Sequence, residues 1–251
     1  MVKDIKTRIR EKTKLSDTAI SIVFDMDSEI TPGQFITVGC GAERILRRPL
    51  SVCDAVNGRV RVVFEARGEG TAWLASREPG EILNVLGPLG NGFRLQSDGL
   101  PALFIGGGIG APPVLFSAKR FVDGGDAVIG FKSKKFVILE REFREAGKTV
   151  SVCTDDGSYG VKGFVTSEAE RLLKKKRYGR VISCGPTLML REIAKLAASY
   201  KVPCQVSLEE RMGCGVGACL VCACKIKGKD GDEYRRVCKD GPVFDAGEVL
   251  F

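Results

Sequence analysis

The chain has 251 residues, of which 44% are hydrophobic and 28% are charged, and its formal net charge at pH 7 is +8. This composition is that of a globular protein, and no apolar run reaches the length of a membrane span. The sequence contains no histidine, which excludes histidine bases, histidine nucleophile triads and histidine-ligated metals. We therefore expect its chemistry to come mostly from bound cofactors.

The N-terminus and the distribution of charge bear on location and partners. Residues 1–14 are charged throughout and lack the apolar core of a signal peptide. We expect a cytoplasmic protein, whose ten cysteines stay reduced and serve as metal, cluster or structural residues rather than as disulfides. The positive charges are scattered, and the one dense run, residues 174–177, ends a predicted helix. We expect no nucleic-acid partner and no membrane.

Residues 1–98 alternate apolar and polar positions and are interrupted by glycine and proline. Residues 34–38 and 59–66 are clear examples, and residues 15–24 and 81–85 follow the same pattern. Short strands with frequent turns predict a small antiparallel barrel.

Residues 99–205 change to a strict alternation of strand and helix. The expected strands are 102–105, 127–131, 149–152, 180–183 and 204–208, and the expected helices are 111–122, 137–146, 165–175 and 187–199. This order predicts a parallel sheet with helices on both faces.

Residues 206–251 are short, polar and rich in glycine and cysteine, so they need a metal or a cluster to hold them together. The whole pattern predicts a multidomain fold of class β plus α/β. Its parts are an antiparallel β-barrel over residues 1–98, a parallel-sheet α/β domain over residues 99–205, and a small C-terminal domain over residues 206–251.

Two short stretches of the predicted barrel have features of a cofactor site. Residues 47–51, RRPLS, place arginine beside a proline-stiffened strand, where it can bind a pyrophosphate or the edge of a flavin. Gly70 and Thr71 begin a helical stretch, residues 71–76, whose free N–H groups can bind a phosphate. Each signal is weak alone, since an ordinary barrel also contains such turns.

Three stretches of the predicted sheet lie where nucleotides bind. Residues 104–113, FIGGGIGAPP, place a glycine loop between a strand and a helix, which is the context of a dinucleotide loop. Cys184-Gly185-Pro186 follows a strand and opens a helix, and Asp155 ends another strand. Both motifs also have explanations without a ligand: Cys184 can be a buried cysteine at a strand end, and Asp155 can belong to an ordinary turn.

Four of the ten cysteines lie within residues 214–224, and Cys238 follows. The residues with the plant-type [2Fe–2S] spacing, C-x4-C-x2-C and then a distant C, are Cys214, Cys219, Cys222 and Cys238. Structural zinc is the alternative, but it usually has paired C-x2-C knuckles and only one such pair exists here. If residues 222–227 form a strand, Cys224 points inward with Ile226 and is a buried thiol rather than a ligand.

These motifs together resemble the ferredoxin-reductase superfamily, which has a flavin barrel, a G-G-G-I-G nicotinamide loop and a C-G-P turn. Residues 207–215, SLEERMGCG, and 236–244, RVCKDGPVF, are similar to the family of electron-transfer subunits of B-type dihydroorotate dehydrogenases. This resemblance covers nearly the whole chain.

The resemblance implies a function and a set of cofactors. The subunits of that family bind FAD and one [2Fe–2S] cluster, take electrons from NADH, and serve pyrimidine biosynthesis. They pass the electrons to an FMN-containing catalytic subunit in a heterotetramer of two plus two, and dihydroorotate is oxidised on that partner. The resemblance thus implies an NADH-dependent flavin and iron–sulfur oxidoreductase subunit.

The resemblance also implies site residues, position by position. The FAD site would comprise Arg48, Pro49, Leu50, Ser51, Val63, Phe64, Glu65, Gly70 and Thr71. The nicotinamide site would comprise Gly106, Gly107, Gly108, Gly110, Asp155, Cys184, Gly185 and Pro186, with the Cys184 thiol near the nicotinamide. The cluster ligands would be Cys214, Cys219, Cys222 and Cys238.

Three alternatives stay open. The same architecture serves small subunits of sulfhydrogenases and of ferredoxin–NADP oxidoreductases. A protein of another class also fits the cysteines and the charge. This would be a basic binding module with no redox role, whose fold is held together by zinc. Finally, Lys132, Lys134 and Lys135 lie where a ribose 2′-phosphate would bind, so they fit either NADP or a solvated turn.

Overall fold

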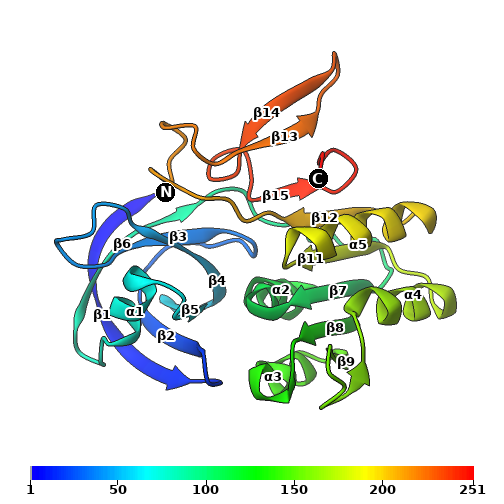
Figure 1. Ribbon diagram of the computed structural model, residues 1–251, viewed down its shortest axis with the longest axis horizontal. Helices are drawn as coiled ribbons and strands as arrows, with labels where there is room; N and C mark the ends of the chain where they lie inside the picture. The colour runs from blue at the N-terminus through cyan, green and yellow to red at the C-terminus, as the bar shows by residue number, and fades with distance from the viewer. Residues whose placement is uncertain (1) are drawn as a thin grey trace.

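The computed structural model describes residues 2–251 and contains a six-stranded barrel, a seven-stranded sheet and a two-stranded hairpin. Figure 1 shows the barrel beside the sheet, with the hairpin above both. None of the helices in the described residues is long and apolar enough to cross a membrane.

The barrel closes in the order β1–β2–β5–β4–β3–β6, with antiparallel neighbours, as predicted. Its strands are β1 (Lys3–Lys14), β2 (Ala19–Asp25), β3 (Phe35–Gly39), β4 (Arg48–Val56), β5 (Arg59–Glu65) and β6 (Ile82–Leu89). Alternate side chains such as Ile36 and Val38 point into the barrel, where they are fully buried. The short helix α1 (Glu69–Ala75) adds Leu74 to this core.

The sheet has the order β10–β9–β8–β7–β11–β12–β15. Its parallel strands are β7 (Ala102–Gly107), β8 (Gly125–Phe131), β9 (Thr149–Thr154), β10 (Val161–Lys162), β11 (Arg180–Cys184) and β12 (Cys204–Ser207). The last strand, β15 (Val243–Asp245), pairs antiparallel with β12 and was not predicted. The C-terminal segment therefore completes one edge of the nucleotide-type sheet.

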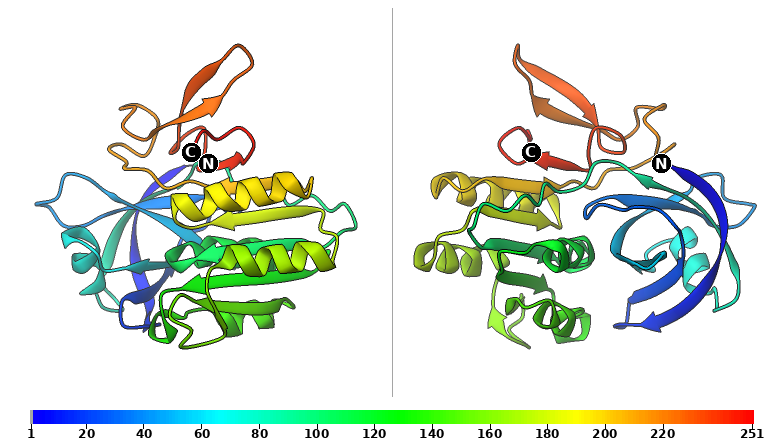
Figure 2. Two further views of the ribbon diagram at one scale, coloured as in Figure 1. Left: turned by 45° about the vertical axis from the view of Figure 1, so that its right-hand side comes forward. Right: turned by 180° about the vertical axis from the view of Figure 1, so that it is seen from behind.

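Helices cover both faces of the sheet, as predicted. The apolar sides of α2 (Ala111–Arg120) and α3 (Glu140–Glu145) pack on one face, and α4 (Val165–Lys175) and α5 (Thr187–Ser199) pack on the other. Figure 2 shows α4 and α5 on the side away from the barrel. The helix expected over residues 137–146 is shorter and begins at Glu140, because Leu139 just before it has a φ of +65°, outside the helical region.

The C-terminal segment is attached to the barrel through a shared hydrophobic cluster. The hairpin consists of β13 (Ala223–Lys227) and β14 (Asp232–Arg236). Phe35 and Leu89 of the barrel pack together with Cys222, Cys238 and Phe244. The outward face of β3 is therefore the platform on which the cysteine-rich segment rests.

Candidate functional site

The four cysteines of the predicted cluster lie together as two pairs. Cys222 and Cys238 are adjacent, because the Cys238 N–H donates to Cys222 Sγ, and Cys219 is close enough to Cys214 to help lower the pKa of its thiol. The pair Cys222 and Cys238 is buried, with 2% of each residue exposed, whereas Cys219 is exposed. One pair thus belongs to the interior and the other lies at the surface.

Backbone N–H groups surround the sulfur atoms. Cys214 Sγ accepts hydrogen bonds from the N–H groups of Val216 at 3.4 Å and Ala218 at 3.2 Å, and Cys222 Sγ accepts one from Cys238 at 3.4 Å. Burial opposes ionisation of Cys214, but these backbone hydrogen bonds lower the pKa of its thiol to about 6. The thiolate is the form of cysteine that binds metal, so the lowered pKa of Cys214 favours metal binding by this loop.

The tight loop needs glycine at two positions. Gly215 and Gly217 have φ values of +74° and +85°, which residues with a Cβ adopt only under strain. Their conformations turn the N–H groups of residues 216 and 218 toward Cys214, so the glycines serve the geometry of the sulfur site.

Arg236 and Asp240 hold the two cysteine pairs together, and the sequence interpretation missed them. Arg236 Nη1 donates to the Gly217 carbonyl at 3.1 Å, and its Nε donates to Asp240 Oδ2 at 3.0 Å. The only signal in the sequence is an arginine two residues before Cys238 and an aspartate two residues after it.

The paired arrangement fits a two-iron cluster. A [2Fe–2S] cluster takes four cysteine thiolates, two on each iron, which matches two pairs of thiols lined by backbone donors. Within residues 2–251, no group of three or more histidine, cysteine, aspartate or glutamate side chains surrounds a single metal position. Cys224 is partly buried and Ile226 is buried between the exposed Lys225 and Lys227, as predicted for the strand.

The predicted flavin strand separates two adjacent arginines into different roles. Arg47 Nη2 is occupied by Asn84 Oδ1 at 2.6 Å and Asp4 Oδ1 at 3.2 Å, so this guanidinium belongs to the barrel wall. Among the described residues, the Arg48 side chain donates only to the Leu46 carbonyl, at 2.6 Å, and it lies against Gly70. A Cβ at Gly70 would be 2.3 Å from Arg48 Nε, so the structure brings these two predicted residues together.

The other predicted flavin residues divide between the two sides of the barrel wall. Leu50 and Phe64 pack inside the barrel, whereas Val63 packs toward the sheet. Pro49 and Ser51 are half-buried and lie opposite Thr37 and Phe35 of β3. The Thr71 hydroxyl accepts hydrogen bonds from Gly68 N at 3.1 Å and Arg67 N at 3.0 Å, so it caps its own helix. Glu65 forms an ion pair with Arg67.

The two predicted nicotinamide motifs meet at the carboxyl ends of β7 and β11. Gly106 lies directly opposite Cys184 in the parallel register. A Cβ at Gly110 would be 2.2 Å from the Cys184 carbonyl oxygen, and one at Gly107 would be 2.9 Å from Pro186. Only glycine permits this close packing, which lies at the edge where sheets of this kind bind ligands.

Cys184 and Asp155 have different environments at this edge. Burial raises the pKa of the Cys184 thiol to about 12, so it stays protonated at neutral pH and is no nucleophile. Asp155 is exposed at the end of β9, two strands away from β7. Beside it, the Lys134 N–H donates to Ser158 Oγ at 2.8 Å, and the Lys134 ammonium lies 5.7 Å from the centre of the Tyr159 ring.

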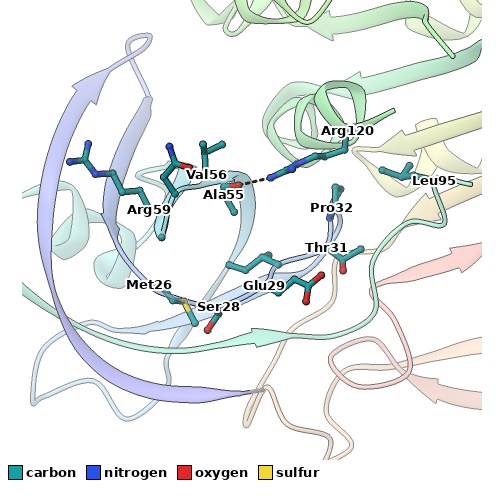
Figure 3. A pocket seen from close by; sticks show the side chains of 13 residues that line it. Met26, Ser28, Glu29, Thr31, Pro32, Ala55, Val56, Arg59, Leu95 and Arg120 are labelled. Carbon is teal, nitrogen blue, oxygen red and sulfur yellow. Dashed lines mark hydrogen bonds between the residues drawn. The ribbon is translucent and has the colours of Figure 1, made fainter. Parts of the chain in front are cut away.

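A depression of about 430 Å³ lies away from all of these motifs. Its lining includes Glu29, Arg59 and Arg120, and Arg120 Nη2 donates to the Ala55 carbonyl at 2.6 Å (Figure 3). None of the predicted site residues lines it, so it is separate from the candidate site.

Comparisons with known proteins agree with these features. Residues 209–250 match the family described as the iron-sulfur cluster binding domain of dihydroorotate dehydrogenase B. The electron transfer subunit of dihydroorotate dehydrogenase B (NAD(+)) from Bacillus caldolyticus is 45% identical over 228 residues, which cover 87% of this chain and 86% of that protein. The subunit of the same name from Caldanaerobacter subterraneus subsp. tengcongensis is 39% identical over 98% of each chain.

A solved structure extends the likeness to three dimensions. The structure of an NADH-dependent reduced ferredoxin-NADP oxidoreductase, described for flavin-based electron bifurcation, is 30% identical with a TM-score of 0.86. The match covers 97% of this chain and 89% of that chain. The barrel, the sheet and the cysteine-rich segment of this protein therefore occur together in a known redox architecture.

Proposed function

The chain belongs to the family of electron transfer subunits of dihydroorotate dehydrogenase B, and from this membership we propose that it carries electrons from NADH to an FMN-containing catalytic subunit. It is an NADH-dependent oxidoreductase subunit with FAD and a [2Fe–2S] cluster, and it serves pyrimidine biosynthesis. Family membership favours this function over the zinc-stapled binding module. The cytoplasm suits it, because a reducing compartment keeps cluster-binding thiols free.

The two cofactors supply the redox chemistry, since a flavin accepts an electron pair as hydride whereas a two-iron cluster carries one electron at a time. Arg48 and the N-terminal turn of α1 would hold the FAD phosphates, and Ser51 would face the flavin ring. The four cysteines would hold the cluster. The glycine loop and the Cys184-Gly185-Pro186 turn would hold the nicotinamide nucleotide.

The chain's own residues bind and orient rather than transfer protons. The sequence has no histidine, and the partly buried Cys184 thiol stays neutral. The observation that carries the proposal is the position of the cysteine pairs on the outward face of β3. Phe35 packs with Cys222 and Cys238, and it lies opposite Ser51 of the flavin strand. A single strand thus joins the predicted flavin site to the predicted cluster site.

The surface around Cys219 suits an acceptor protein. Cys219 is exposed, and the apolar side chains of Val216, Leu220 and Val221 beside it are 47%, 62% and 58% exposed. Exposed apolar side chains beside a redox centre suit a surface that a partner subunit covers. We place the FMN-containing subunit there, in a heterotetramer of two plus two, and dihydroorotate is oxidised on that partner.

A pair of cysteine variants tests the function. Cys219→Ser should lose the cluster and the reduction of the partner, but NADH should still bleach the flavin. Cys224→Ser, which alters a nearby cysteine outside the four ligands, should retain iron, flavin and partner reduction. Normal partner reduction by an iron-free Cys219→Ser protein would contradict the proposal, as would a wild-type protein that lacks flavin.

A second function is supported by the 30% identity to the ferredoxin-NADP oxidoreductase structure over 97% of this chain. The same subunit would then serve as the small subunit of such an enzyme. Co-purification decides between the two. An FMN protein that oxidises dihydroorotate supports the first function, and a partner that reduces NADP supports the second.

A further inference from the structure

The segment that leaves the barrel lies against the turn that carries Cys238. Residues 90–101 link β6 to β7, and Asn91 is near the start of this linker. Residues 237–240 form a turn that is closed by N–H groups donating to the Arg236 carbonyl at 2.8 Å and 3.1 Å. The last carbonyl groups of such a turn have no donors within it, as at the end of a helix, so they need partners from elsewhere.

Asn91 supplies those partners. Its side-chain Nδ2 donates to the Lys239 carbonyl at 3.1 Å and to the Asp240 carbonyl at 3.0 Å. Its backbone N–H donates to the Gly241 carbonyl at 2.6 Å. One residue of the linker thus satisfies three consecutive carbonyl groups directly after Cys238.

The same part of the linker is also held to the predicted flavin strand. Gln34 Nε2 donates to the Gly90 carbonyl at 2.8 Å, and the Gln34 carbonyl accepts the N–H of Val52, which belongs to β4, at 3.1 Å. Gly90 packs closely on Pro242, because a Cβ there would be 2.5 Å from the proline Cδ. A continuous path of contacts therefore runs from the flavin strand through the linker to the residues after Cys238.

We propose that Asn91 is a positioning residue for the [2Fe–2S] cluster, because its amide ties the turn of Cys238 to the barrel that holds the flavin. The Arg236–Asp240 ion pair joins the cysteine pairs to each other, but both of its residues belong to the cysteine-rich segment. Asn91 instead fixes that segment relative to the flavin strand. The inference rests on the proposed function, and it makes electron passage from flavin to cluster depend on Asn91, whereas reduction of the flavin by NADH does not.

The test compares Asn91→Asp, which keeps the shape but has no side-chain donor, with Asn91→Gln, which keeps the amide. Ser97→Ala is the matched control, because Ser97 lies on the same linker but its Oγ donates to Asp123 Oδ1, at 2.8 Å, away from the cysteines. Iron and FAD are counted per chain, and each loaded protein is mixed rapidly with NADH while the flavin and cluster absorbances are followed separately. Amide hydrogen exchange over residues 237–241 reports on the turn itself.

Residues that orient metal ligands typically contribute about 10–100-fold to metal affinity or activity. We therefore expect Asn91→Asp to slow reduction of the cluster at least about tenfold and to leave reduction of the flavin by NADH at the wild-type rate. Amide exchange over residues 237–241 should be faster in the same variant. Asn91→Gln and Ser97→Ala should keep the wild-type values of all three.

The other outcomes contradict defined statements. A loaded Asn91→Asp protein with wild-type exchange and wild-type cluster reduction overturns the proposal, and so does equal slowing of flavin and cluster reduction. Equal slowing of cluster reduction by Asn91→Gln or Ser97→Ala also overturns it.

Loss of iron is informative as well. If Asn91→Asp loses iron, Asn91→Ala, which has no carboxylate to repel the carbonyl groups, is measured in its place. Loss of iron by both, with retention by Asn91→Gln, supports the amide contact, and loss by glutamine too contradicts it. A wild-type protein without a cluster or without flavin overturns the proposed function instead.

Discussion

Arg236 and Asp240 are joined by a two-pronged hydrogen-bonded ion pair, from Nε to Oδ2 at 3.0 Å and from Nη2 to Oδ1 at 3.1 Å. The remaining guanidinium nitrogen, Nη1, donates to the carbonyl of Gly217, which lies between Cys214 and Cys219. Cys238 lies between the two charged residues in the chain. The ion pair therefore ties the exposed cysteine pair to the buried one.

The first prediction is that Arg236→Gln releases the cluster faster. Glutamine cannot reach Gly217 and both carboxylate oxygens of Asp240 at once. The loop between Cys214 and Cys219 therefore loses the hydrogen bonds that connect it to Asp240. Residues that orient metal ligands typically contribute about 10–100-fold to metal affinity. We expect at least about tenfold faster bleaching of the cluster absorbance in the presence of a chelator. Arg235→Gln is the matched control, because Arg235 pairs with Glu233 on the exposed hairpin strand. Equal rates for the two variants would contradict the role of Arg236.

The second prediction concerns the contact between the glycine loop and the Cys184 turn. Gly110→Ala places a methyl group 2.2 Å from the Cys184 carbonyl oxygen, so the loops must move apart. Such overpacking typically costs about 1–3 kcal/mol. We expect the KM for NADH to rise about tenfold while the FAD and iron contents stay unchanged. The alanine methyl of Gly247→Ala meets open space and serves as the control. An unchanged KM in a folded Gly110→Ala protein would show that NADH does not use this loop.

The elements that could be predicted from the sequence are those with strong periodicity. The bounds of α4 and α5 agree with the expected helices 165–175 and 187–199, because their apolar faces repeat at helical spacing. β1 was not predicted as a separate strand, since Thr7 and Ile9 are its only buried residues and Ile5 is its only other apolar one. β15 has only three residues and is defined by its pairing with β12, so nothing local in the sequence marks it.

The candidate site likewise has features that could be predicted from the sequence and features that could not. The cysteine spacing predicted four candidate ligands, but it did not predict which thiol lies next to which. The register of β7 and β11 brings Gly106 opposite Cys184, and this contact arises between residues far apart in the chain. Thr37 is one polar residue within an apolar strand, so its position beside Gly215 becomes visible only in three dimensions. Each motif is a short run of consecutive residues, whereas the residues that contact it come from distant parts of the chain.

The third prediction tests whether Arg48 holds FAD. Gly70→Ala puts a methyl group 2.3 Å from Arg48 Nε, and the flexible arginine side chain can yield without any backbone shift. The fold should therefore survive while the guanidinium leaves the N-terminal turn of α1. We expect FAD affinity to fall about tenfold, since a charge-assisted hydrogen bond contributes about 1.5–3 kcal/mol. Flavin retained per chain after gel filtration measures the effect. Gly68→Ala, whose methyl meets open space, is the control and should retain flavin. Full FAD retention by Gly70→Ala would contradict the role of Arg48.

The last prediction concerns a carboxylate that supports the sheet away from the cofactors. Glu168 of α4 is 5% exposed, and it accepts hydrogen bonds from Arg171 Nε at 2.7 Å and from Ser151 Oγ at 2.6 Å. The Arg171 hydrogen bond lowers the pKa of Glu168 from its ordinary value, with a further contribution from Ser151, although burial opposes the shift. The ionised form is thus favoured by folding.

Because the pKa of Glu168 is lower in the folded chain than in the unfolded one, its contribution to stability is complete above the unfolded pKa. That contribution is lost as the pH falls through the folded pKa. Glu168→Gln should therefore lower the free energy of unfolding at pH 7 by about 1–3 kcal/mol. The deficit relative to wild type should shrink as the pH falls below the ordinary glutamate pKa of about 4.3, because the unfolded chain then binds a proton that the folded chain still excludes. Urea unfolding followed by circular dichroism at each pH measures both free energies. Glu170→Gln, which breaks only an exposed pair with Lys174, should show little deficit at any pH. A deficit for Glu168→Gln that stays constant down to pH 3 would mean that the charge of Glu168 does not stabilise the fold.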